Sequence, residues 1–148
     1  MTEVAVLGAG AWGTALALQL VRCGHRVRLW AHDPERAAVM QRDRENARYL
    51  PGIALPEALT VTADLATAAE CDRLVMAVPS IALREVAERL APSLRPGAWV
   101  ACATKGLEEG SGKLMHQVLA ESLGERVGGV AILSGPSFAE EVAQGQPT

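Results

Sequence analysis

The sequence has few cysteines, and their spacing indicates neither a disulfide framework nor a metal site. Cys23, Cys71 and Cys102 are odd in number and form no CxxC pair and no His-paired ligand spacing. Disulfide-rich domains and zinc sites both depend on paired, closely spaced ligands. We therefore expect three free thiols in a reducing compartment and no bound metal.

An excess of positive charge is also lacking. The formal net charge is -3, the isoelectric point is about 5.6, and no basic stripe occurs along the chain. Proteins that bind nucleic acid neutralise phosphates with clustered lysine and arginine. Nucleic acid is therefore not an expected partner.

No long apolar run is present. Met1-Thr2-Glu3 carries no positive side chain, and the apolar segment that follows is broken by three glycines, Thr14 and Gln19. A membrane span needs about 20 apolar residues, and a signal peptide starts with positive charge. We expect neither, and we expect a cytoplasmic protein. With 148 residues, 49% of them hydrophobic, the chain suits one domain with one core.

The most informative motif that is present is Gly8-Ala9-Gly10-Ala11-Trp12-Gly13, between a short apolar strand and an alanine- and leucine-rich helix. A helix start attracts anions because its first amides are unpaired and its dipole leaves about half a positive charge there. We expect Gly8 to make the tight turn, Gly10 to leave room for a pyrophosphate, and Gly13 to let the helix pack closely. The alternative is a glycine turn without a ligand, and we predict a dinucleotide site.

Strand-like and helix-like segments alternate along the rest of the chain. The expected strands are the one before Gly8, then Arg26–Trp30, Leu59–Thr62, Arg73–Val78, Trp99–Ala103 and Val130–Leu133. Helices are expected from the motif to Val21, from Pro34 to about Asn46, after Asp64, from Ser80, and over Leu114–Leu123, with a loop over Asn46–Pro56. Because βαβ crossovers are right-handed, this alternation predicts an α/β fold: a doubly wound parallel Rossmann sheet over residues 1–148.

Residues just after the strands are the site candidates, because ligands of such sheets bind beyond the carboxyl ends of the strands. Asp33 lies about 20 residues beyond Gly13, where a carboxylate often binds the adenosine ribose. It is equally suited to cap the helix that starts with Pro34. His32 and Arg36 lie beside it and are candidates to contact a ribose 2′-phosphate. The sequence leaves NAD and NADP open, with NADPH slightly favoured.

Two further candidates follow later strands. Lys105 follows a buried strand and precedes a glycine, so we expect it to face the cleft rather than to be only a solvated lysine. Ser137 and Glu140 have the spacing of a capping box. A helix start at Gly135 to Ser137 would offer free amides to an anionic or hydroxylated substrate beside Lys105. For Ser80 we expect only a helix cap.

Four motifs then carry a family resemblance. They are Gly8-Ala9-Gly10-Ala11-Trp12-Gly13-Thr14-Ala15, Asn46 with Tyr49-Leu50-Pro51-Gly52, Thr104-Lys105-Gly106, and Ser134-Gly135-Pro136-Ser137-Phe138-Ala139 with Glu141-Val142 and Pro147-Thr148. In this order they resemble the N-terminal part of the bacterial-type NAD(P)-dependent glycerol-3-phosphate dehydrogenases. The resemblance implies reversible reduction of dihydroxyacetone phosphate to sn-glycerol 3-phosphate, for phospholipid synthesis in the cytoplasm.

The resemblance also implies positions for the ligands. It puts the cofactor near Ala11, Trp12, His32, Tyr49, Lys105 and Ala139, and the substrate near Lys105, Gly135 and Ser137. The family often has serine where this chain has Ala11. One hydroxyl contact to the cofactor is therefore in doubt, whereas contacts from backbone amides would remain.

The resemblance implies that the general acid/base is a lysine in a helical C-terminal domain beyond Thr148, so we name no catalytic residue in this chain. Loss of such a group typically costs about 100- to 10,000-fold in rate. We therefore expect the isolated chain to bind dinucleotide with little or no turnover. A homodimer of the full-length protein is left open. The alternatives are a related dehydrogenase of a hydroxy acid or sugar phosphate, and a non-catalytic NAD(P)-sensing module.

Overall fold

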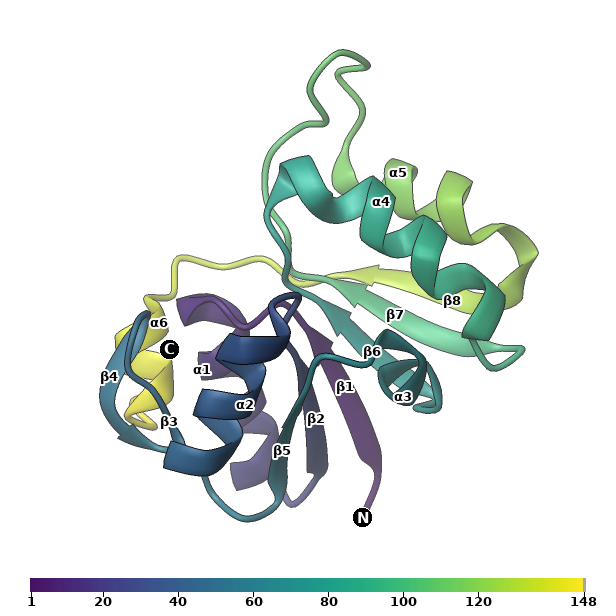
Figure 1. Cartoon of the computed structure of the whole chain (residues 1–148). Helices are drawn as coiled ribbons and strands as arrows, with labels where there is room; N and C mark the ends of the chain where they lie inside the picture. Colours follow the sequence, from purple (N-terminus) through teal and green to yellow (C-terminus); the bar gives the residue numbers. More distant parts are fainter. Residues whose placement is uncertain (148) are drawn as a thin grey trace.

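A six-stranded parallel sheet forms the centre of the molecule (Figure 1). The computed structural model describes residues 1–147, and Thr148, the last residue of the fourth motif, lies outside them. The strands are β1 Glu3–Leu7, β2 Arg26–Trp30, β5 Leu59–Thr62, β6 Arg73–Met76, β7 Ala98–Cys102 and β8 Val127–Ile132. Their spatial order, β5-β2-β1-β6-β7-β8, is that of the doubly wound Rossmann sheet, which confirms the predicted fold.

Helices cover both faces of this sheet. One face carries α1 Ala11–Arg22, α2 Pro34–Asp43 and α6 Ala139–Ala143, and the other carries α3 Leu65–Ala69, α4 Ser80–Leu90 and α5 Met115–Leu123. Short 3-10 turns occur at Ala91–Ser93 and Gly124–Arg126. In β1, Val4 and Val6 join one buried apolar cluster while Ala5 and Leu7 join the other. This is why the central strands are apolar throughout.

The helices that residues 1–147 form include none with the length and apolar content needed to span a bilayer.

The predicted start of α2 is confirmed, but its predicted end is wrong. Asp33 is the N-cap, and its carboxylate accepts hydrogen bonds from the amides of Glu35 and Arg36. The helix ends at Asp43 rather than near Asn46, because Arg44 adopts a left-handed conformation with φ of 55°.

The loop predicted over Asn46–Pro56 is also wrong in part. Glu45–Asn46 (β3) and Leu50–Ala54 (β4) form a small antiparallel hairpin. Pro51 and Gly52 suggested a loop, but both are exposed on a two-stranded ribbon, where a proline costs no ladder hydrogen bond. Leu50 and Leu55 are buried, so the hairpin packs on the body of the domain.

Two predicted helix caps are wrong. Ser80 is the first residue of α4, the N-cap is Pro79, and no side chain caps the helix. Ser137 and Glu140 form no capping box, because the N-cap is Phe138, which has an extended backbone, and α6 starts only at Ala139. An N-cap residue needs this extended backbone just before the first helical residue, and here Pro79 and Phe138 have it.

Candidate functional site

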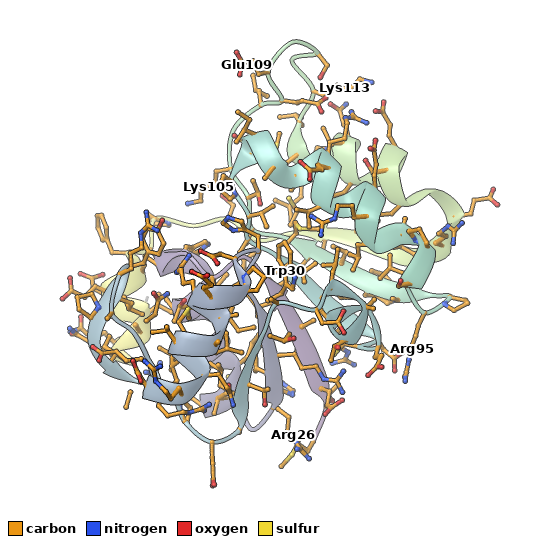
Figure 2. The ribbon with its side chains drawn as sticks, viewed as in Figure 1. Arg26, Trp30, Arg95, Lys105, Glu109 and Lys113 are labelled. Carbon is orange, nitrogen blue, oxygen red and sulfur yellow. The ribbon has the colours of Figure 1, made fainter. Side chains whose placement is uncertain are left out.

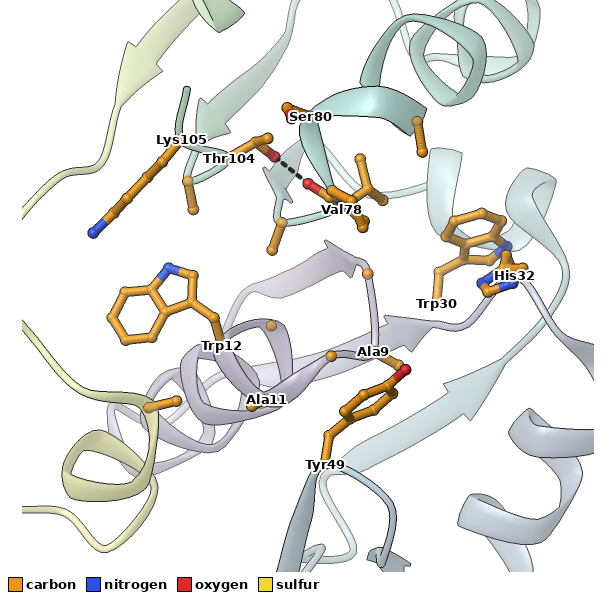
Figure 3. Close-up of a pocket in the computed structure, with 18 of the residues that line it drawn as sticks. Ala9, Ala11, Trp12, Trp30, His32, Tyr49, Val78, Ser80, Thr104 and Lys105 are labelled. Carbon is orange, nitrogen blue, oxygen red and sulfur yellow. Dashed lines mark hydrogen bonds between the residues drawn. The ribbon is translucent and has the colours of Figure 1, made fainter. Parts of the chain in front are cut away.

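A cleft of about 690 Å³ opens at the carboxyl edge of the sheet, between the ends of β1 and β6 (Figure 3). The strand order reverses at this point, which is where ligands of doubly wound sheets bind. The predicted site residues that line it are Gly8, Gly10, Ala11, Trp12, Gly13, His32, Tyr49, Lys105, Ser137 and Ala139. The fold thus brings together candidates from both ends of the sequence.

The three glycines of the motif are needed for different structural reasons. Gly8 has φ of +119°, and a Cβ there would lie 2.6 Å from the carbonyl oxygen of Ala77. A Cβ on Gly13 would lie 1.8 Å from the carbonyl oxygen of Gly8, so α1 packs against the turn as predicted. A Cβ on Gly10 would meet no atom within 4 Å. Packing therefore requires Gly8 and Gly13, while the space beside Gly10 is free for a ligand.

A buried polar network lies behind the glycine-rich turn. The Asn46 side-chain amide donates to the carbonyl oxygen of Ala9 at 3.0 Å and to Thr14 Oγ1 at 2.8 Å. Asn46 Oδ1 accepts from the backbone amide of Tyr49 and from Arg36, both at 3.4 Å. The Arg36 guanidinium also donates to the carbonyl oxygen of Ala9. Arg36 is thus hydrogen-bonded to the protein on the cleft wall where the sequence suggested a phosphate contact.

The sequence alone predicted no role for Asn46. Its only signal was its place in the second resemblance motif, and no local pattern distinguishes it from the charged residues around it. Its partners lie in the turn after β1, on α1 and on α2, so only the assembled fold reveals the network.

The wall on the β2 side carries aromatic and cationic groups. Two guanidinium groups lie over the Tyr49 ring, with Cζ of Arg36 4.4 Å and Cζ of Arg48 5.1 Å from the ring centroid. Burial lowers the pKa of Arg36. His32 lines the same wall, whereas Asp33 lies outside the lining and caps α2. The capping role left open for Asp33 is therefore present, and a ribose contact stays a prediction.

Lys105 lies on the opposite wall, just beyond β7. Its Nζ donates to the carbonyl oxygen of Gly135 at 3.2 Å and lies 6.0 Å from the ring centroid of Trp12. Figure 2 shows Lys105 on the cleft side of the sheet, away from Arg26 and Arg95 at the other end. The lysine therefore faces the cleft as predicted.

The residues beside Lys105 are fixed by hydrogen bonds. Thr104 Oγ1 donates to the carbonyl oxygen of Val78 at 2.7 Å, which joins the ends of β6 and β7 (Figure 3). Ser137 lines the cleft, and Gly135 lies outside the lining as the acceptor for Lys105. Arg22, at the end of α1, donates to the carbonyl oxygens of Val142 and Ala143 at the end of α6. Helix α1 thus holds the segment that carries Ser137.

The cysteines are free, as predicted. Cys23 is exposed, and Cys71 and Cys102 are buried. Burial raises the pKa of the Cys71 and Cys102 thiols, so neither has the thiolate character of a reactive cysteine. Residues 1–147 bring together no group of three or more His, Cys, Asp and Glu side chains that could hold a metal ion.

A doubly wound parallel sheet whose first strand ends in a glycine-rich turn at the switch-point cleft defines a Rossmann-type domain. A family model described as the N-terminus of NAD-dependent glycerol-3-phosphate dehydrogenase matches residues 3–148. The chain belongs to this family.

Individual relatives agree with this assignment. The chain is 48% identical over 149 residues to a glycerol-3-phosphate dehydrogenase (NAD(P)+) of Hydrogenovibrio crunogenus, covering 98% of this chain and 43% of that protein. It is 55% identical over 148 residues to the protein of the same name from Halorhodospira halophila, covering 99% and 44%. The crystal structure of glycerol-3-phosphate dehydrogenase from Coxiella burnetii matches with a TM-score of 0.92 at 43% identity, covering 99% and 45%. The chain thus spans less than half the length of these relatives.

Proposed function

We propose that this chain is the cofactor-binding part of an NAD(P)-dependent sn-glycerol-3-phosphate dehydrogenase. That enzyme would interconvert dihydroxyacetone phosphate and glycerol 3-phosphate for phospholipid synthesis in the cytoplasm. The observation that carries the proposal is the switch-point cleft, in which a glycine-lined helix start faces Lys105 and Ser137 across the opening. Membership of the family supplies the choice of substrate.

The proposed cofactor site lies along the turn between β1 and α1. The amides at positions 10 to 13 have no acceptor within the helix, because they precede its first carbonyl partners. Together with the positive end of the helix dipole they suit a pyrophosphate, and the open space beside Gly10 fits its close approach. The proposed cofactor contacts are Gly8, Gly10, Ala11, Trp12, Gly13, His32, Asp33, Tyr49, Lys105 and Ala139.

The proposed substrate site lies at the Lys105 end of the cleft, with Gly135 and Ser137. The bound nicotinamide would exchange a hydride with the substrate carbon. Lys105 would orient and polarise the substrate oxygen, since its ammonium group lies at the cleft edge between Gly135 and Trp12. The resemblance implies that the lysine which exchanges the proton lies outside this chain. We therefore expect binding with little turnover from the isolated chain.

For the cofactor we favour NADPH over NADH. The guanidinium groups of Arg36 and Arg48 lie over the Tyr49 ring, and His32 lines the same cleft as Arg36 and Tyr49. A 2′-phosphate would bind favourably beside such groups. Titration with both reduced cofactors tests this preference, and tighter binding of NADH would contradict it.

The test of the proposed function is a calorimetric titration with NADPH and NADH, alone and with dihydroxyacetone phosphate, on the wild type and Lys105→Ala. We expect the wild type to bind cofactor and Lys105→Ala to lose about tenfold or more in affinity for dihydroxyacetone phosphate, since a hydrogen bond from a charged group is removed. Arg26→Ala is the matched control, because Arg26 is an exposed cation at the opposite end of the sheet in Figure 2. Unchanged cofactor and substrate binding in Lys105→Ala would refute the assignment of this residue. Light scattering on the same sample would report whether the chain associates into a homodimer.

A further inference from the structure

Hydrogen bonds from the protein interior fix the direction of the Ala9–Gly10 peptide group in the glycine-rich turn. The carbonyl oxygen of Ala9 accepts from the Asn46 side-chain amide at 3.0 Å and from the Arg36 guanidinium. The peptide bonds of residues 1–147 include no cis bond. In a trans peptide the carbonyl and the following amide hydrogen point in opposite directions. With the Ala9 carbonyl held toward the protein interior, the Gly10 amide hydrogen must point away from it, toward the cleft.

The Asn46 side chain can make these contacts in only one orientation. It is 1% exposed, and its NH₂ group donates to Ala9 and to Thr14 Oγ1, which is fully buried. Its oxygen faces the backbone amide of Tyr49 and the guanidinium of Arg36. A rotation of the amide by 180° would set its oxygen against the Ala9 carbonyl and its NH₂ group against Arg36. Buried polar groups that lose their partners are costly, so the network keeps Asn46 in place.

We propose that Asn46 is a positioning residue for the pyrophosphate. It would hold the Ala9–Gly10 peptide so that the Gly10 amide, with those of the next positions, faces the diphosphate, without touching the ligand itself. Because Asn46 belongs to β3, it also connects the glycine-rich turn to the β3–β4 hairpin, whose Tyr49 lies on the β2 side of the cleft. The inference rests on the dinucleotide site proposed above and adds to it a residue outside the cleft lining.

The test compares Asn46→Ala and Asn46→Asp with Thr14→Val, using ADP and NADPH as probes. Asn46→Ala removes the donor to Ala9, and Asn46→Asp puts a carboxylate oxygen against the Ala9 carbonyl. Thr14→Val removes the other acceptor of the same NH₂ group and leaves the bond to Ala9, so it is the matched control. We expect both Asn46 variants to raise the Kd for ADP and NADPH by about 10- to 100-fold, which corresponds to the loss of the hydrogen bond from the Gly10 amide to the charged diphosphate. Thr14→Val should change the Kd by less than about threefold.

A second measurement separates positioning from a loss of stability. The amide resonance of Gly10 should move downfield when the wild type and Thr14→Val are saturated with ADP, and much less in the Asn46 variants at saturation. A purely structural role would weaken folding and leave the shift at saturation unchanged. If neither Asn46 variant folds, the inference is tested on the wild type alone. A Gly10 amide resonance that does not move downfield on saturation with ADP would then overturn the inference.

The outcomes also separate this inference from the proposed function. A wild type that binds neither ADP nor NADPH would overturn the dinucleotide site itself. A wild type that binds both, with Asn46 variants that bind as tightly as Thr14→Val, would overturn the role of Asn46 and leave the proposed function standing.

Discussion

The two walls of the cleft are built in different ways. The glycine-rich wall presents backbone, and the polar groups that hold it, Asn46 and Thr14, are fully or almost fully buried. The Lys105 wall presents a side chain on a loop, and partly exposed ion pairs tie this loop to α4 (Arg84 with Glu108) and to α5 (Lys113 with Glu121). Figure 1 shows this loop projecting beyond both helices.

This difference predicts how each wall responds to change. A wall made of backbone depends on steric fit, which solvent does not weaken and which an added methyl group can destroy. A wall held by exposed charges depends on interactions that water and salt screen, and each contributes little. Substitutions on the first wall should therefore have large effects that are insensitive to salt, and those on the second wall small ones that are sensitive to it.

The largest effect is expected for Gly13→Ala. Its Cβ would lie 1.8 Å from the carbonyl oxygen of Gly8, so α1 would have to move away from the turn. Overpacking of this kind costs about 3 kcal/mol or more when backbone has to shift, measured as the free energy of unfolding in urea. Gly10→Ala is the control, because its Cβ meets open space, and it should cost about 1 kcal/mol through its poorer N-cap. If both variants lost the same free energy of unfolding, close packing of position 13 against Gly8 would not be what stabilises the glycine-rich wall.

Gly10→Val should leave the fold intact and remove the ligand. The side chain has room in the protein, but it would occupy the space beside the helix start that we assign to the pyrophosphate. We expect the Kd for NADPH to rise by at least about 100-fold, with a loss of stability like the roughly 1 kcal/mol expected for Gly10→Ala, since both replace the same N-cap glycine. Retained affinity would mean that the nucleotide binds elsewhere.

The features that the sequence predicted well are those coded by local patterns. The GxGxxG spacing, the apolar strands and the Asp33-Pro34 helix start each depend on residues close together in the chain, and the structure has them where expected. Both cleft walls could be foreseen because ligands of parallel sheets bind beyond the strand ends. Lys105 follows β7 directly, so its place at the cleft edge required no knowledge of tertiary contacts.

The features that the sequence did not predict depend on contacts between distant segments. The β3–β4 hairpin forms although Pro51-Gly52 resembles a loop, because Leu50 and Leu55 are buried against the domain. The role of Asn46 arises from partners up to 37 residues away in the sequence. Ser137 had the spacing of a cap, but the N-cap of α6 is Phe138. For the hairpin and for Ser137 the structure overrode a local signal, whereas for Asn46 there was no local signal.

The smallest effect is expected for Arg84→Met, on the Lys105 wall. The Arg84 guanidinium hydrogen-bonds both carboxylate oxygens of Glu108, at 2.5 and 2.9 Å, and these bonds, with a smaller contribution from the Ser111 hydroxyl, lower the pKa of Glu108 from 4.5 to about 2. Because the pKa is lower in the folded than in the unfolded state, this pair stabilises the fold above about pH 4.5, and its contribution is lost as the pH falls toward 2. The wild type should therefore melt slightly above Arg84→Met at pH 7, and this difference should shrink on acidification.

High salt and a control substitution at Arg42 separate the contribution of the Arg84–Glu108 ion pair from other effects of Arg84→Met. The difference in Tm between the wild type and Arg84→Met should also shrink in about 1 M NaCl, where the screening length falls to about 3 Å. Arg42→Met is the control for the lost charge, because within residues 1–147 Arg42 pairs only with its neighbour Asp43 and does not tie the loop to the helices. Substrate affinity at the Lys105 end should fall in Arg84→Met and stay unchanged in Arg42→Met. If the difference in Tm persists in full at pH 2 and in high salt, the aliphatic stem of Arg84 rather than its charge holds the loop, and both walls then depend on packing.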